Sequence, residues 1–161
     1  MKKCVFSGTF DPPTKGHEYV IENCLKMFDE VVVAVMVNPD KEPLIPAEKR
    51  KELIEKLFAG EKRVRVCTFD GAATDLLQRE NTPFYVRGVR DVIDFEYENR
   101  NFFANRNLMG DIVTIYLPAP QENIVISSSL VRNSIKFKKA YSDYIPAPIL
   151  QDVIKLLQNP Q

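Results

Sequence analysis

The sequence contains no run of about 18 apolar residues, the length that a helix needs to cross a bilayer, so we expect no membrane span. Its beginning, Met-Lys-Lys-Cys-Val-Phe, lacks the apolar core of about 7–15 residues that marks a secretory signal, which favours a cytoplasmic location. An excess of charge is absent too: lysine plus arginine and aspartate plus glutamate number 22 each, so the formal net charge is zero. This balance argues against a broadly cationic protein that binds nucleic acid.

Cysteine is scarce, and several familiar motifs are missing. Cys4, Cys24 and Cys67 lie far apart and form no CxxC pair, which argues against a zinc or redox site and favours buried, reduced thiols. The sequence has no GxxxxGK[ST], and no GxGxxG follows its first predicted strand. A P-loop and a dinucleotide site of the usual type are therefore not expected.

What the sequence does contain is an alternation of β-rich runs with helical periods. Strands are predicted at Lys3–Phe6, Glu30–Val37, Val64–Phe69, Phe84–Val86 and Ile112–Leu117. Helices are predicted at His17–Phe28, Ala47–Phe58, Ala73–Glu80, Asp91–Asn107, Ser127–Lys138 and Pro148–Gln158, a loop at Asn38–Pro46, and fraying at 159–161. Because strands separated by helices imply right-handed crossovers, we expect an α/β protein with a Rossmann-like, doubly wound, five-stranded parallel sheet in a single domain, 1–161.

The most informative stretch is Ser7–His17, which joins the first strand to the first helix. Four turn residues, Gly8, Pro12, Pro13 and Gly16, crowd this junction, where the chain must reverse direction. Ligands bind at the carboxyl ends of strands in such sheets, and a helix N-terminus there attracts anions. Since Gly16 has no Cβ, a phosphate could approach its backbone, with the His17 imidazole beside it. The stretch predicts the floor of a nucleotide-phosphate site, although His17 taken alone could equally cap or pack.

Three blocks of residues carry a resemblance to a known family. Gly8-Thr9-Phe10-Asp11-Pro12 with Thr14-x-Gly16-His17 resembles the T/HxGH nucleotidyltransferases, and Ile126-Ser127-Ser128-Ser129 resembles their second signature. Between them, Arg87-Gly88-Val89-Arg90-Asp91-x-x-Asp94-Phe95-Glu96-Tyr97-Glu98 is similar to the block typical of bacterial phosphopantetheine adenylyltransferases. Blocks in this order and spacing, over nearly the whole chain, are far more specific than T-x-G-H alone.

The resemblance implies adenylyl transfer from ATP to 4′-phosphopantetheine, giving dephospho-coenzyme A and pyrophosphate. A phosphate monoester has a second pKa near 6 and is mostly dianionic at neutral pH, so it needs no general base. Positioning and charge stabilisation should then carry the reaction, with Mg²⁺ expected on the ATP phosphates. We predict no metal site held by the protein, and we interpret Asp11 as a loop or cap residue because no second carboxylate stands at ligand spacing.

The resemblance also assigns roles to single residues. It makes His17, Lys41 and Arg90 catalytic, with His17 stabilising charge on the α-phosphate. It implies ATP contacts at Thr9, Phe10, His17, Gly88, Val89, Arg90, Glu98, Asn123, Ile124, Val125, Ile126, Ser127, Ser128 and Ser129. It implies contacts with the second substrate at Thr9, Lys41, Ala73, Arg87 and Asn105.

Each role has a structural alternative. Arginine forks suit phosphate oxygens, but Arg87 and Arg90 could instead pair with Asp91, Asp94 or Glu96. Glu98 could be a solvated helix carboxylate, Lys41 a surface lysine, and Thr9 a residue that only stabilises a turn. Ordinary N-capping needs just one of the three serines at 127–129.

The chain departs from the family pattern at some positions, while the residues expected to handle the phosphates match it. Ser7 stands where the family commonly has proline, Asn123-Ile124-Val125 lacks an aromatic, and Ala73 and Ala104 replace larger apolar residues.

Alternative functions are an adenylyl- or cytidylyltransferase for another acceptor, such as nicotinamide mononucleotide or a sugar- or glycerol-phosphate, and a non-catalytic ATP-binding regulatory module. The resemblance further implies a homohexamer and inhibition by coenzyme A. Phe102 and Phe103 could serve an interface or the core.

Overall fold

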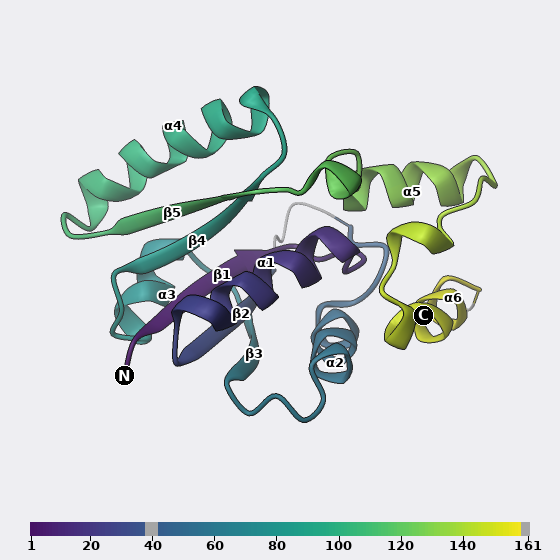
Figure 1. Ribbon diagram of the computed structural model, residues 1–161, viewed down its shortest axis with the longest axis horizontal. Coiled ribbons are helices and arrows are strands. Elements are labelled where there is room, and N and C mark those ends of the chain that lie inside the picture. The colour runs from purple at the N-terminus through teal and green to yellow at the C-terminus, as the bar shows by residue number, and fades with distance from the viewer. Residues whose placement is uncertain (38–41, 159–161) are drawn as a thin grey trace.

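The computed structural model of the chain describes residues 1–37 and 42–158. Within these ranges, five parallel strands form one sheet in the order β3-β2-β1-β4-β5. The strands are β1 (Lys3–Gly8), β2 (Glu30–Met36), β3 (Val64–Phe69), β4 (Phe84–Val89) and β5 (Val113–Pro118). The α-helices are α1 (Lys15–Met27), α2 (Ala47–Leu57), α3 (Ala73–Arg79), α4 (Val92–Leu108), α5 (Ser128–Lys136) and α6 (Leu150–Gln158). Three short 3-10 helices lie at Gln121–Asn123, Ser142–Tyr144 and Ala147–Ile149 (Figure 1).

The predicted Rossmann-like sheet is confirmed, and most elements begin and end within a few residues of the predicted bounds. The clearest error concerns β4, which was expected to stop at Val86 but continues to Val89. Arg87 and Gly88 therefore lie in the strand and do not follow it. A charged residue suggested a loop, yet the strand can keep Arg87 because Glu98 neutralises its guanidinium group.

The order of the strands reverses at β1, which has β2 on one side and β4 on the other. Pairing between β1 and β2 runs as far as Gly8, whereas pairing between β1 and β4 ends at Phe6 and Val86. Beyond that point β4 stays paired with β5, so the carboxyl ends of β1 and β4 separate. A crevice at such a reversal is where open α/β sheets bind ligands.

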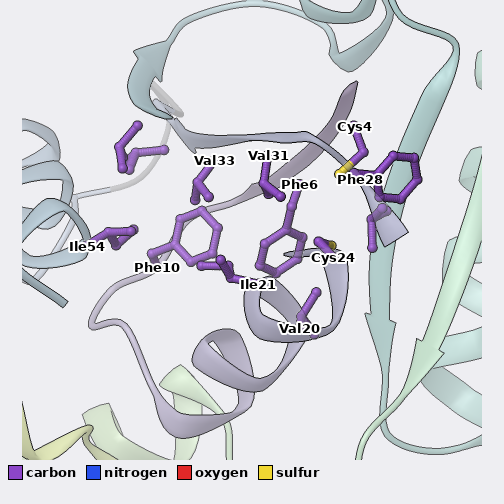
Figure 2. Close-up of a cluster of buried hydrophobic side chains, with 13 residues drawn as sticks. Cys4, Phe6, Phe10, Val20, Ile21, Cys24, Phe28, Val31, Val33 and Ile54 are labelled. Carbon is purple, nitrogen blue, oxygen red and sulfur yellow. The ribbon is translucent and has the colours of Figure 1, made fainter. Parts of the chain in front are cut away.

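Apolar side chains from both faces of the sheet build the core. On one face, Phe6 and Phe10 lie between β2 and α1, as Figure 2 shows. On the other face, Tyr85 packs with Leu76 and Leu77 of α3. Buried thiols are confirmed for Cys4 and Cys24, while Cys67 is half-buried.

Helix α4 lies at the edge of the sheet beside β4 and β5 (Figure 1), and several of its apolar side chains are exposed. Phe102 packs against the core, whereas Phe103 is exposed, so an interface role for Phe103 stays a prediction. Other exposed apolar residues of α4 are Val92, Ile93, Phe95, Tyr97 and Leu108. None of the helices in the described part of the chain is long and apolar enough to span a membrane.

Candidate active site

A cavity of about 370 Å³ opens where β1 and β4 separate. Its walls come from the loop after β1, the first turn of α1, the end of β4, α4 and the start of α5. Most of the site residues expected from the sequence line it: Thr9, Phe10, Gly16, His17, Arg87, Gly88, Val89, Arg90, Glu98, Asn123, Ile126, Ser127, Ser128 and Ser129. The fold thus brings together three sequence blocks that are up to about a hundred residues apart.

Other expected site residues are not brought to this cavity. Within the described ranges, Ile124 and Val125 lie on the surface outside its lining, 45% and 64% exposed. Ala73 begins α3 and packs against the core, and Asn105 lies near the end of α4. Lys41 falls outside the described residues. The roles of these five residues remain predictions from the resemblance.

The loop after β1 is held rigidly by buried polar groups. The Asp11 carboxylate is 3% exposed and accepts hydrogen bonds from the backbone N–H groups of Leu44 (2.7 Å) and Ile45 (2.9 Å). Arg50, also buried, donates to the carbonyls of Ile45 (2.8 Å) and Thr9. The interpretation of Asp11 as a loop residue is confirmed, and these bonds fix the backbone that leads to His17.

His17 lies in the first turn of α1, three residues after the N-cap Thr14. Its Nδ1 accepts a hydrogen bond from the Thr14 backbone N–H at 3.0 Å, in the manner of a capping box. Since Nδ1 is an acceptor, the proton of the neutral ring sits on Nε2. No described residue accepts from Nε2, which makes Nε2–H the donor that the imidazole offers to a ligand in the cavity.

Beneath His17 lies Phe10, with the two ring centroids 4.8 Å apart in an edge-to-face arrangement. The whole Phe10 residue is only 1% exposed, so its ring packs under the imidazole as part of the core. A Cβ on Gly8 would meet the Phe10 ring at 3.1 Å, and a Cβ on Gly88 would meet Val20 at 2.9 Å. These glycines allow the close packing that supports the imidazole. At Gly16 a Cβ would be in ordinary van der Waals contact with Thr14 Oγ1 at 3.6 Å and with the Ile126 carbonyl at 3.8 Å, so packing within the protein does not require a glycine there.

The environment of His17 keeps its imidazole neutral. Burial, and then the positive charges of Arg87 and Arg90, lower the pKa of His17 from 6.5 to about 4. A lowered pKa means that the ring stays neutral at physiological pH and takes a proton only as the pH falls toward 4. The side chain therefore acts as a hydrogen-bond donor and not as a fixed cation.

This state can be measured without assignment, because His17 is the only histidine in the sequence. We expect its ¹H–¹³C imidazole signals in the free protein to stay constant between pH 8 and about pH 5.5, with a midpoint near 4. Adding ATP should raise the midpoint, because phosphate charge offsets that of the arginines. A midpoint near 6.5 in the free protein would contradict the geometry described for this ring.

Both arginines of the site already have carboxylate partners on α4. Arg87 donates to both oxygens of Glu98, from Nε at 2.8 Å and from Nη2 at 2.6 Å. Arg90 donates to both oxygens of Asp94, at 2.7 and 3.0 Å. The alternative that these arginines pair with acidic side chains therefore holds for both. Arg90 has the expected partner Asp94, whereas the partner of Arg87 is Glu98, which was not among the expected ones. Glu98 is buried, so the solvated reading of this residue was wrong.

The three serines at 127–129, at the start of α5, each make a different hydrogen bond. Ser127 caps the helix by accepting from the Leu130 backbone N–H at 3.0 Å. Ser128 donates to the Pro12 carbonyl at 2.8 Å, which ties α5 to the loop after β1. Ser129 accepts from Arg132 at 2.9 Å. Two helix N-termini, those of α1 and α5, thus face one cavity, and both attract negative charge.

Sequence reasoning missed Arg132, which lines the cavity. Its Nη1 donates to the Asp11 carbonyl at 2.8 Å while Nη2 donates to Ser129. The signal was available, because a cation three residues after Ser129 lies on the same face of the helix. With Arg132 included, three guanidinium groups stand against the two carboxylates of Asp94 and Glu98 in the cavity wall.

Comparisons with known proteins agree with this geometry. A family model described as cytidylyltransferase-like matches residues 5–134. Phosphopantetheine adenylyltransferase of Nautilia profundicola is 40% identical over 151 residues, which cover 94% of this chain and 98% of that protein. The protein of the same name from Phocaeicola vulgatus is 42% identical over 146 residues, 91% of this chain and 96% of the other.

A solved structure shares the fold. The solved structure is that of a Vibrio parahaemolyticus protein described as a nicotinate-nucleotide adenylyltransferase. It matches with a TM-score of 0.68 at 23% sequence identity, and the match covers 96% of the present chain and 99% of the Vibrio chain. The fold and the family match together define a nucleotidyltransferase. Within this class, the chain belongs to the phosphopantetheine adenylyltransferase family, as its three sequence blocks predicted.

Proposed function

We propose that the protein transfers the adenylyl group of ATP to 4′-phosphopantetheine, giving dephospho-coenzyme A and pyrophosphate in coenzyme A biosynthesis. The names of its relatives support this reaction. The observation that carries it is the convergence of a neutral histidine, three arginines and two helix N-termini on one cavity. This arrangement suits the meeting of a phosphate dianion with a triphosphate.

The transfer is a direct in-line displacement. An oxygen of the acceptor phosphate attacks the α-phosphorus of ATP, the bond from that phosphorus to the bridging oxygen breaks, and pyrophosphate leaves. Because the attacking phosphate is already ionised, no side chain removes a proton. His17 Nε2–H donates to an α-phosphate oxygen as negative charge builds there, while Arg90 and the start of α5 hold the departing phosphates. Arg87 and Thr9 meet the acceptor phosphate, and the role of Lys41 toward the same phosphate stays a prediction from the resemblance.

Mg²⁺ would reach this site with ATP. In the described part of the chain, no group of three or more histidine, cysteine, aspartate and glutamate side chains is arranged to hold a metal ion. The carboxylates of the cavity, Asp94 and Glu98, are engaged with arginines. Mg²⁺ commonly binds through substrate phosphates, and bound to those of ATP it would supply charge neutralisation in this cavity.

The test is pyrophosphate release from ATP with single acceptors. We expect rapid release with 4′-phosphopantetheine and little with nicotinamide mononucleotide, glycerol phosphate or no acceptor. Mass spectrometry should find dephospho-coenzyme A in equal amount to the pyrophosphate. Faster release with another acceptor would move the protein to a related transferase, and ATP binding without any release would favour the regulatory module.

The remaining expectations concern assembly, regulation and location. We expect the homohexamer that the resemblance implies, and a partner subunit in such an assembly would cover exposed apolar residues of α4 such as Val92 and Ile93 (71% and 78% exposed). Light scattering at micromolar concentration measures this state. Inhibition by coenzyme A and a cytoplasmic location stay predictions from the resemblance and the sequence.

A further inference from the structure

A pair of buried hydroxyl groups lies at the wall of the cavity, which Ser7 lines, on neighbouring strands. Ser7 near the end of β1 is 3% exposed and Tyr85 of β4 is 7% exposed. Their side-chain oxygens are 2.6 Å apart, a short hydrogen bond. Apolar side chains would fill the same volume at less cost, since two hydroxyl groups lose their water here. The pair therefore needs a reason other than packing.

Arg87 supplies such a reason, because its guanidinium group contacts Tyr85 of the pair. Nη1 of Arg87 donates to the Ser7 carbonyl at 2.6 Å and reaches the Tyr85 hydroxyl at 3.4 Å. The Arg87 Cζ atom also lies 5.6 Å from the centroid of the Tyr85 ring, within the range of a cation–π contact. The side of the guanidinium group that faces β1 is thus held by the Ser7 carbonyl and, at longer range, by the Tyr85 hydroxyl, which the Ser7 hydroxyl in turn holds in place.

The opposite side of Arg87 is held by Glu98 of α4, through Nε and Nη2. A guanidinium group has five N–H donors, and these contacts with described residues engage four of them. The fifth, on Nη2, has no acceptor among the described residues. Arg87 therefore presents a single N–H in a set direction, and not the free two-pronged fork that the sequence suggested.

We propose that the Ser7–Tyr85 hydroxyl pair is a positioning device that sets the orientation of Arg87 for the acceptor phosphate. This inference rests on the proposed function for the identity of the acceptor. Without the pair, Nη1 keeps the Ser7 carbonyl but loses the Tyr85 hydroxyl, so one of the contacts that fix the orientation of the guanidinium group is removed. The acceptor would then have to order the side chain that is ordered in advance in the wild type.

Two hydroxyl groups on β5 provide matched controls. Thr114 and Tyr116 are the register partners of Tyr85 and Arg87, so their side chains lie on the same face of the sheet. Their hydroxyl oxygens are buried, and neither has a hydrogen-bond partner in the described part of the chain. Tyr116→Phe therefore removes a buried phenol hydroxyl from the same face without breaking a hydrogen bond.

The experiment compares wild type, Tyr85→Phe, Ser7→Ala, the double variant and Tyr116→Phe. Binding of 4′-phosphopantetheine is measured by calorimetry without ATP, and kcat and both KM values are measured by pyrophosphate release. We expect about three- to tenfold weaker acceptor binding and a matching rise in its KM for Tyr85→Phe and Ser7→Ala, the effect of one hydrogen bond. The KM for ATP and kcat should change less than about twofold, and the double variant should be no weaker than the worse single variant.

A purely structural role would lower the unfolding midpoint and the active fraction while leaving the acceptor KM unchanged. If Tyr85→Phe and Ser7→Ala both bind the acceptor as tightly as Tyr116→Phe does, the positioning role is overturned while the proposed function stands. If the wild type neither binds 4′-phosphopantetheine nor releases pyrophosphate with it, the proposed acceptor is wrong and the role assigned to the pair fails with it. Should one variant fail to fold, the other still decides.

Discussion

His17→Ala is expected to lower kcat by about 10²–10³-fold, the usual effect of removing one donor that stabilises charge in a transition state. The KM for ATP should change less than about threefold, because Arg90 and two helix N-termini still bind the phosphates. Steady-state pyrophosphate release, with both substrates varied, separates the two effects. The fold should survive, since the hydrogen bonds lost are the two contacts of Nδ1 with Thr14, to its backbone N–H and to its hydroxyl.

His17→Gln is the matched variant for this position, because its amide can still donate a hydrogen bond. It should recover part of the activity, whereas a histidine that acted as a proton acceptor would leave the Gln and Ala variants equally slow. A kcat for His17→Ala within tenfold of the wild type would remove His17 from the chemistry.

Arg87→Met is expected to destabilise the fold by about 2–4 kcal/mol, because it leaves the buried Glu98 carboxylate without its partner. This loss of stability lies toward the low end of what breaking a buried ion pair costs, because the Arg87 side chain is 22% exposed and that of Glu98 is 9% exposed. Replacing both residues, as Arg87→Met with Glu98→Leu, should recover most of the lost stability. Urea unfolding of the three proteins measures the free energies.

Among these three proteins, the affinity for 4′-phosphopantetheine should not follow the free energy of unfolding. Both the single and the double variant lack the guanidinium group, so both should bind 4′-phosphopantetheine far more weakly than the wild type. A double variant that is as unstable as Arg87→Met, or one that binds the acceptor normally, would contradict the role given to this ion pair.

Much of the fold could be predicted because its signals are local. The β-branched run from Val31 to Val35 lies in the middle of the sheet, buried on both faces, and such runs are typical of parallel strands. Gly16 and His17 were placed at a strand-to-helix junction from turn residues alone, and the junction lies at the cavity. The order of the three family blocks then predicted which segments meet there.

What escaped prediction depends on contacts between segments that are distant in the sequence. The end of β4 was missed because Arg87 is acceptable in a strand only with Glu98 and Ser7 against it. Asp11 could be placed in a loop, but its bonds to residues 44 and 45 needed the fold. Ala73 and Asn105 were assigned by resemblance, and no local pattern relates them to the cavity.

Transfer without a general base is the feature on which the mechanism depends, and the pH dependence of kcat/KM for 4′-phosphopantetheine tests it most directly. We predict a decline below about pH 6, set by the second ionisation of the acceptor phosphate. Because the pKa of His17 is lowered to about 4, the same decline should appear in His17→Gln, at lower absolute rate. A decline that vanishes in His17→Gln would show that the histidine removes a proton and would contradict the mechanism.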